Sequence, residues 1–212
     1  MAGAVAAAFL RWAGSPDRAL AVTQLTTYQH TGTAGGQSAT LVSRDFTVIA
    51  QELAQRGVVL QRWPARVALA EGADQAEILA AYAAEIARVQ ESGGYATVDA
   101  IRMTPDHPER QALRQKFLAE HTHSEDEVRF FVEGCGLFCL HIGDEVLQVL
   151  CERNDWLAVP AGTRHWFDMG PEPHFCALRF FNDPAGWVAE FTGDPIAERY
   201  PRLDDPQRLP PV

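Results

Sequence analysis

Hydrophobic residues follow a helical period in the first half of this chain and a strand-like pattern in the second half. Phe46, Ile49 and Leu53 are spaced three and four residues apart, which predicts an amphipathic helix that ends at Gly57. Three further elements are predicted before residue 120: a helix from about Asp74 to Gly93, a strand over Val98–Met103, and a helix to about Leu118 with Pro108 in its first turn and a capping box of Asp106 and Glu109.

From His121 onward, short apolar segments alternate with turn residues. The predicted strands are Val128–Val132, Leu137–His141, Val146–Cys151, Trp156–Val159, His165–Met169 and Phe175–Phe181. Turn signals separate them, among them Glu133-Gly134, Gly143-Asp144 and Ala161-Gly162. Trp187–Phe191 and Pro195–Tyr200 are expected to form short closing helical turns. The pattern predicts a mainly β fold, an antiparallel barrel or jelly roll with flanking α-helices packed outside it.

Length and charge limit the classes of function that fit. A chain of 212 residues is of ordinary size for one domain, so we expect residues 23–212 to form a single domain. Residues 1–22 are expected to be a disordered extension, because the apolar stretch Ala2–Leu10 is too short to span a membrane and lacks a positive leading segment. A net charge of −10 argues against binding to nucleic acid or to an anionic membrane surface. We predict a cytoplasmic monomer.

Four cysteines occur without a metal-binding or redox spacing. They are Cys135, Cys139, Cys151 and Cys176. Cys135 and Cys139 lie in a segment that is predicted to be extended, where their Cα atoms would be roughly 13 Å apart, too far for a disulfide. We therefore expect reduced and mostly buried thiols.

Three histidines and a glutamate form the most informative pattern. His121 and His123 are two residues apart, Glu127 follows, and His165 lies far downstream. On a strand, residues i and i+2 point to one face with Cα atoms roughly 6.7 Å apart, so both imidazoles can reach one ion. A mixed nitrogen and oxygen ligand set suits a divalent first-row metal, and four ligands on an ion that prefers six leave two positions open for chemistry.

The surrounding residues extend this pattern to the two halves of a cupin signature. The first half is His-x-His-x3-Glu-x6-Gly, from His121 to Gly134, and the second half ends in Pro160-Ala161-Gly162-Thr163-Arg164-His165. Asn154 stands where the second half usually has glycine. Asn tolerates a positive φ better than other non-glycine residues, so a turn is still expected there.

Two segments resemble a more specific family, the acireductone dioxygenases, which are cupin enzymes of methionine salvage. The segments are residues 117–134 (FLAEHTHSEDEVRFFVEG) and 165–170 (HWFDMG), and the similarity runs from about Leu25 to Leu203. The resemblance implies one Fe(II) or Ni(II) ion per chain, O2 as co-substrate, and the substrate 1,2-dihydroxy-3-oxo-5-methylthiopentene. It also implies 4-methylthio-2-oxobutanoate and formate as products with iron. With nickel it implies methylthiopropionate, formate and carbon monoxide.

Further residues are candidates for substrate binding. Arg129 follows Glu127 by two positions, so on a strand its guanidinium faces the same interior and can stabilise an enediolate dianion, the role that the family gives the matching arginine. Arg179 is a candidate for a second inward-facing cation, and Phe117, Phe167 and Trp187 are candidates for the walls of an apolar slot. The resemblance links Glu120 and Asp126 to metal loading or conformational coupling, whereas the sequence alone indicates carboxylates that are exposed or that lie behind the ligands.

Four histidines lie outside the motif, and two other classes of protein are compatible with a cupin signature. His30, His107, His141 and His174 lack partners at ligand spacing and are predicted to be surface or capping residues. One alternative function is another metal-dependent cupin enzyme, such as a sugar-phosphate isomerase or another metal dioxygenase. The isomerase would need clustered basic residues for phosphate. The other is a non-catalytic cupin binding module, which has no need of an arginine facing the ligands.

Overall fold

The computed structural model describes residues 22–30, 38–91, 95–183 and 188–205, so the predicted N-terminal extension lies outside the described residues except for Val22. In chain order, the elements are β1 (Gln24–Gln29), β2 (Ala39–Ser43), α2 (Phe46–Ala54), β3 (Val59–Arg62), α3 (Gln75–Ala81), α4 (Ala83–Glu91), β4 (Thr97–Met103), α5 (Arg110–Leu118), β5 (His121–Thr122), β6 (Glu127–Ile142), β7 (Glu145–Glu152), β8 (Asp155–Val159), β9 (Arg164–Asp168), β10 (Phe175–Phe181), β11 (Glu190–Phe191) and the 3-10 helix η3 (Pro195–Arg199).

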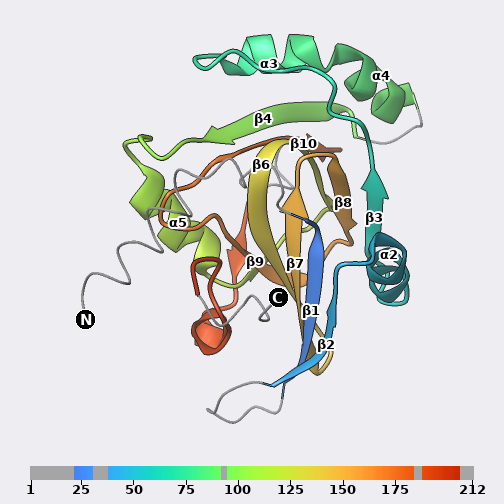
Figure 1. The fold of residues 1–212 in the computed structure, drawn as a ribbon, viewed down its shortest axis with the longest axis vertical. Coiled ribbons are helices and arrows are strands. Elements are labelled where there is room, and N and C mark those ends of the chain that lie inside the picture. The colour runs from blue at the N-terminus through green and yellow to red at the C-terminus, as the bar shows by residue number, and fades with distance from the viewer. Residues whose placement is uncertain (1–21, 31–37, 92–94, 184–187, 206–212) are drawn as a thin grey trace.

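Strand β6 belongs to both halves of the sheet and runs through the middle of the fold (Figure 1). Its first part pairs with β8 and β10, and its second part pairs with β7 and β9. The order β11-β5-β9-β6-β7-β1-β2 is joined through β6 to β8 and β3 on one side and to β10 and β4 on the other. Each of these strand pairs is antiparallel, which confirms the predicted mainly β fold with flanking helices.

An irregularity in β6 explains how one strand serves two sheet halves. The pairing with β10 skips Val132, because Ala177 pairs with Phe131 and Cys176 with Glu133, and Gly134 follows with φ +59°. Before the shift, odd-numbered residues such as Phe131 belong to the interior cluster; after it, even-numbered residues such as Phe138 do. A bulge changes which face a side chain occupies because side chains alternate along a strand. The sequence predicted two separate strands around Glu133-Gly134, and this was wrong because the chain bends there without leaving the sheet.

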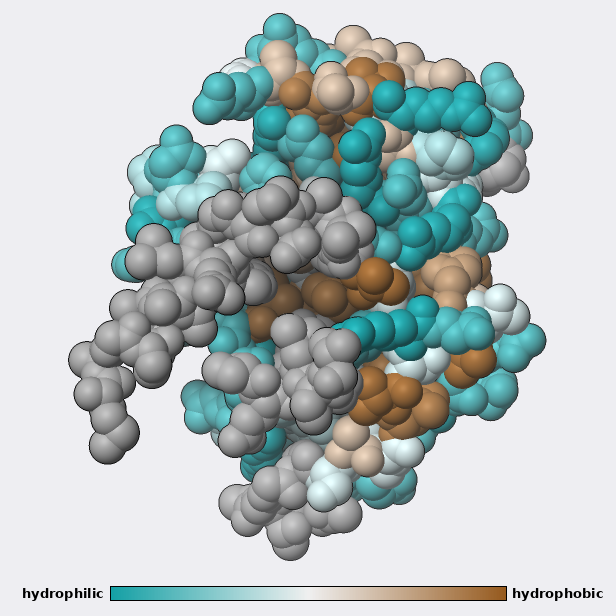
Figure 2. All heavy atoms as spheres, in the orientation of Figure 1, coloured by the Kyte–Doolittle hydropathy of each residue, from teal (hydrophilic) through white to brown (hydrophobic). Residues whose placement is uncertain are grey.

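Three hydrophobic clusters lie inside the barrel and on its two outer faces. The interior cluster includes Phe131, Phe138 and Phe167. On one outer face, α3 and α4 cover the sheet half that contains β4 and β10, which Figure 1 shows as a separate layer. On the other outer face, η3 packs residues such as Ile196 against β7 and β9. Both faces of β6 are therefore buried, which accounts for its nearly continuous apolar sequence. Polar residues cover much of the surface in Figure 2, with smaller apolar patches between them.

The predicted helices need correction at two places. The helix expected from Asp74 to Gly93 is divided into α3 and α4 at Tyr82, whose ring is fully buried against Phe130 and whose hydroxyl donates to Val67 O. Asp74 does form a capping box, with Glu77. The capping box expected at Asp106 is absent, because a turn before Arg110 separates Asp106 from α5, and Glu109 makes no capping hydrogen bond with its side chain.

The ends of the chain and the loops confirm some of the predictions and contradict others. Strands β1, β2 and β3 were not predicted. The closing turn expected over Trp187–Phe191 is wrong for residues 188–191, since Glu190–Phe191 pairs with β5 as β11. The turn over Pro195–Tyr200 is confirmed as η3, and Asn154 has φ +85°, as its position in a turn required. All four cysteines are free, and all but Cys135 are buried, as expected. Among the described residues, no helix is both long and apolar enough to cross a membrane.

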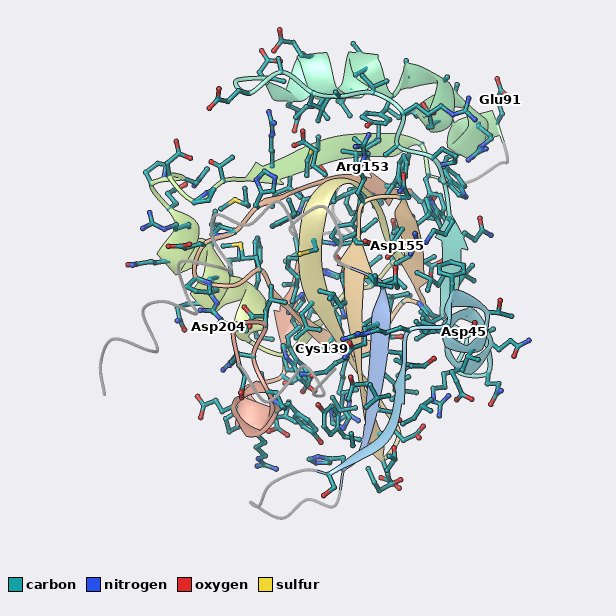
Figure 3. The ribbon with its side chains drawn as sticks, viewed as in Figure 1. Asp45, Glu91, Cys139, Arg153, Asp155 and Asp204 are labelled. Carbon is teal, nitrogen blue, oxygen red and sulfur yellow. The ribbon has the colours of Figure 1, made fainter. Side chains whose placement is uncertain are left out.

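The buried carboxylate of Asp168, at the end of β9, forms hydrogen bonds with two segments outside the barrel, α5 and the chain at Leu203. It accepts hydrogen bonds from Arg114 Nε of α5 at 2.8 Å and from the backbone N–H groups of Gly170 and Leu203, both at 2.9 Å. Burial alone would raise the pKa of Asp168, but these bonds and the charge of Arg114 hold it below its usual value. Asp204 also pairs with Arg114, at 2.6 Å, from a more exposed position beside α5 (Figure 3).

We predict that Asp168→Ala lowers the free energy of unfolding by roughly 3 kcal/mol, because it leaves a largely buried guanidinium without its main partner. The matched control Asp204→Ala removes an exposed partner of the same arginine and should cost less than about 1 kcal/mol. Urea denaturation measures both values, and equal losses would show that burial of Asp168 is not the source of the stability.

The lowered pKa of Asp168 predicts that the stability of the fold depends on pH. Because its pKa is lower in the folded chain than in the unfolded chain, its contribution is complete above the unfolded pKa and is lost as the pH falls through the folded pKa. The difference in stability between wild type and Asp168→Asn should therefore be largest near neutral pH and shrink on acidification. A difference that grows on acidification would contradict the sign of the pKa shift.

Candidate metal centre

Four side chains from separate parts of the chain converge at one end of the barrel. His121 lies on β5, His123 follows it, Glu127 begins β6, and His165 lies on β9. One ligand atom from each of them lies within 4.8 Å of the others, a spacing that can hold a single metal ion. The ring centroids of His121 and His165 are 4.4 Å apart, and those of His121 and His123 are 5.0 Å apart. The structure thus brings together the four residues that the motif singled out.

Backbone pairing explains this convergence. His121 and His165 are directly opposite each other in the antiparallel pair of β5 and β9. The turn before His165 contains Gly162 at φ +75°, and Gly162 N–H donates a hydrogen bond of 2.9 Å to His123 O. A residue with a side chain would be strained in that conformation. Gly162, from the second half of the motif, therefore holds in place the loop that carries His123.

Hydrogen bonds orient two of the imidazoles. His121 Nδ1 lies 2.7 Å from Ala119 O, and His165 Nδ1 lies 2.8 Å from Thr163 O. A carbonyl oxygen can only accept, so each Nδ1 carries a proton and each Nε2 presents its lone pair to the centre. Burial is the main cause that lowers the pKa of His121 to about 4, and the nearby His165 lowers it as well. This imidazole is therefore neutral at physiological pH. Neutral rings with free Nε2 atoms are suited to bind a metal.

The fourth side chain offers an oxygen that has no hydrogen bond. Glu127 Oε2 lies 2.6 Å from His165 Nε2 and 3.4 Å from His123 Nε2. Within the described part of the chain, Glu127 Oε2 and His165 Nε2 are both buried and make no hydrogen bond of acceptable geometry. Two lone-pair donors this close favour a cation between or beside them. The residues therefore fit a divalent metal ion.

Arg129 supplies the charge that keeps Glu127 ionised. Its Nε donates to Glu127 Oε1 at 2.6 Å, and its Nη2 contacts the same oxygen. Burial would raise the pKa of Glu127, but the charge of Arg129 holds it well below its usual range. Arg129 Nη1 is buried and makes no hydrogen bond to any described residue. The guanidinium thus keeps one donor that another molecule can use.

A cavity of about 600 Å³ opens onto this cluster. Phe117 and Phe167, predicted as walls of an apolar slot, both line it, with ring centroids 6.4 Å apart. Gly136 makes room for Phe167, since a side chain on Gly136 would overlap the Phe167 ring. The cavity therefore combines a polar inner end, formed by the histidines and Arg129, with apolar walls. The cavity lining also contains residues that the sequence did not single out, namely Ile101, Leu113, Lys116, Phe138, Val188, Ala189 and Phe191.

Arg179 lines the cavity as predicted, but its guanidinium is already paired. It donates two hydrogen bonds to Asp99 on the neighbouring strand β4, at 2.8 and 2.6 Å. Burial lowers the pKa of Arg179, and the positive charge of Arg129, which faces it across the pair of β10 and β6, lowers it further. Of the two predicted cations, Arg129 is therefore the better placed to act on a bound molecule.

The two acidic residues that flank the ligands point away from the centre. Glu120 is buried behind β5, where its carboxylate binds His141 Nδ1 at 2.6 Å and Thr192 Oγ1 at 2.7 Å. Asp126 is exposed and accepts a hydrogen bond from Ala161 N–H at 2.9 Å. His141 is buried, so its prediction as a surface or capping residue was wrong; its strand turns it toward Glu120. Trp187 lies outside the described residues.

Comparison with known proteins gives a consistent assignment. The family model described as the ARD/ARD' family matches residues 26–189. A protein of Prochlorococcus marinus (strain MIT 9313) named acireductone dioxygenase is 71% identical over 163 residues, which cover 77% of this chain and 88% of that protein. A protein of the same name from Synechococcus sp. (strain RCC307) is 70% identical, with the same coverage of both chains.

A solved structure agrees with the sequence relatives. It is described as acireductone dioxygenase from Bacillus anthracis with cadmium ion in the active center. The match has a TM-score of 0.65 and 28% sequence identity, and it covers 80% of this chain and 98% of that one. The related enzyme can thus hold a divalent ion in its active centre.

We predict that the purified protein binds about one iron, nickel, cobalt or manganese ion per chain and that His123→Ala reduces this stoichiometry to well below one. The variant removes one of four convergent donors, and the remaining three hold the ion less tightly. Elemental analysis after dialysis measures the metal content, with the exposed His174→Ala as the matched control. Full occupancy in His123→Ala would rule out this cluster as the metal site.

Proposed function

This chain belongs to the ARD/ARD' family of acireductone dioxygenases, and we propose that it cleaves 1,2-dihydroxy-3-oxo-5-methylthiopentene with O2 by means of one Fe(II) or Ni(II) ion held by His121, His123, Glu127 and His165. The observation that carries the proposal is the buried, unbonded Glu127 Oε2 beside the Nε2 atoms of the histidines. The same reaction gives the enzyme its place in methionine salvage.

A bound ion supplies Lewis acidity and a template for the two oxygens of the enediol. The protein side chains do the rest of the binding. Arg129 stands beside Glu127 with Nη1 free, so its charge favours loss of the enediol protons and its donor can hold one enediolate oxygen. The guanidinium carbon also lies 5.5 Å from the Phe138 ring centroid and 5.4 Å from that of Phe167, so both rings pack against it.

The apolar walls of the cavity fit the other end of the substrate. Phe117 and Phe167 line the same cavity as the histidines and Arg129. A methylthio group carries no hydrogen-bonding hydrogen, so it loses little on leaving water and gains contact with such walls. Head and tail of the proposed substrate therefore match the two parts of the cavity. A sugar phosphate would need several unpaired basic side chains, but Arg129 and Arg179 of the cavity lining are already paired with Glu127 and Asp99, which disfavours the isomerase alternative.

The first test concerns Arg129. Arg129→Ala should retain about one metal ion per chain at saturating metal, because the bound cation itself keeps Glu127 ionised. It should nevertheless lose on the order of 10²–10³ in kcat/KM, because it removes a preorganised donor at developing negative charge. Ultraviolet spectra of the substrate bound under nitrogen should show less dianion than in wild type. Arg66→Ala removes an exposed cation and serves as the control. Wild-type turnover and spectra in Arg129→Ala would refute the assigned role.

The second test concerns the metal. One apoprotein preparation is reconstituted separately with Fe(II) and with Ni(II), since a ligand set of imidazoles and one carboxylate accepts both ions. The iron form should yield 4-methylthio-2-oxobutanoate and formate, whereas the nickel form should yield methylthiopropionate, formate and carbon monoxide. Gas analysis of the two reactions measures the difference. Identical products from both forms would contradict the metal-dependent choice while leaving the dioxygenase activity intact.

A further inference from the structure

Lys116 is the sole lysine among the 18 Lys and Arg residues of the sequence, and it lines the cavity at the metal centre. It lies in the last turn of α5 and is exposed. Leu113, Lys116 and Phe117 all line the cavity and are spaced three and four residues apart, so one face of α5 forms this wall. That face presents a charged group between two apolar ones.

The charges around the cavity are unbalanced. Its described lining contains Lys116, Arg129 and Arg179 but no carboxylate. Arg129 is bound to Glu127 and Arg179 to Asp99, which lie behind the wall. Within the described residues, Lys116 has no ion pair. The site therefore offers one cation that no carboxylate of the described residues neutralises.

The position of this cation matters because the whole chain has a net charge of −10, which repels an approaching anion. An ammonium without a carboxylate partner makes the local potential more positive and attracts an anion into the cavity. A lysine in the last turn of a helix also interacts favourably with the helix dipole, but that interaction is equally available on the faces of α5 that do not line the cavity.

We propose that Lys116 is a specificity-determining residue that captures the substrate as an anion and that it selects molecules with a negatively charged oxygen head and an apolar tail. The identification of the anion as an enediolate rests on the proposed function. Lys116 acts on binding, before the chemical step, whereas Arg129 acts beside the reacting oxygens. Loss of Lys116 should therefore lower kcat/KM and leave kcat nearly unchanged.

Steady-state oxygen uptake with the metal-loaded enzyme tests this separation. Lys116→Ala should lower kcat/KM about tenfold at low ionic strength and leave kcat within about twofold, and the loss should shrink in high salt as screening weakens the attraction. Lys116→Arg should restore most of kcat/KM, and Lys116→Glu should lower it further. Arg66→Ala is the control for net charge. Equal kcat/KM in wild type and Lys116→Ala, or a loss that salt does not diminish, would overturn the proposal.

Chemical labelling gives a readout that does not depend on turnover. Acetylation of the metal-loaded protein under nitrogen modifies Lys116 as its single lysine, and peptide mass spectrometry measures the extent. Acireductone, or ascorbate as a stable enediolate, should slow the labelling of Lys116, whereas chloride at equal ionic strength should not. Protection by ascorbate without any turnover of acireductone would preserve the capture site while refuting the proposed function. Labelling at the same rate with and without both enediolates would refute the capture site.

Discussion

The buried carboxylate of Glu127 divides its two oxygens between two tasks, and the rest of the site depends on this division. Oε1 is bound by Arg129, while Oε2 faces the Nε2 atoms of His123 and His165. The guanidinium keeps the carboxylate ionised in a place where burial would otherwise favour its protonated form. A charged carboxylate and neutral imidazoles are the forms in which these side chains bind a metal. The ion pair prepares the carboxylate, while burial and the backbone carbonyls bound to Nδ1 prepare the imidazoles of His121 and His165.

The sheet is built so that this ion pair points inward. Glu127 and Arg129 occupy the inward face of the first part of β6, and the bulge at Val132 lets the second part place Phe138 on the interior as well. Phe138 packs its ring 5.6 Å from the ring of His165, so the later half of the strand supports a ligand from β9. The catalytic end and the core are thus connected through one continuous strand.

The sequence predicted those features that local periodicity and spacing determine. The strands from β6 to β10, the helix α2 and the four convergent side chains follow from short-range patterns around residues such as His121 and Gly162. The sequence did not predict β1, β11 or the continuity of β6 as one strand, because these depend on partner strands far along the chain. For the same reason, the pairing of Arg179 with Asp99 and the inward turn of His141 toward Glu120 could not be read from local sequence.

The most direct test of the account is an anaerobic crystal structure of the iron-loaded protein with anomalous diffraction measured at the iron edge. The account predicts one anomalous peak bonded to Nε2 of His121, His123 and His165 and to Oε2 of Glu127, with Arg129 still on Oε1. An ion bound through Oε1 after displacement of Arg129, or a peak away from this cluster, would contradict the claim that the ion pair prepares the metal site.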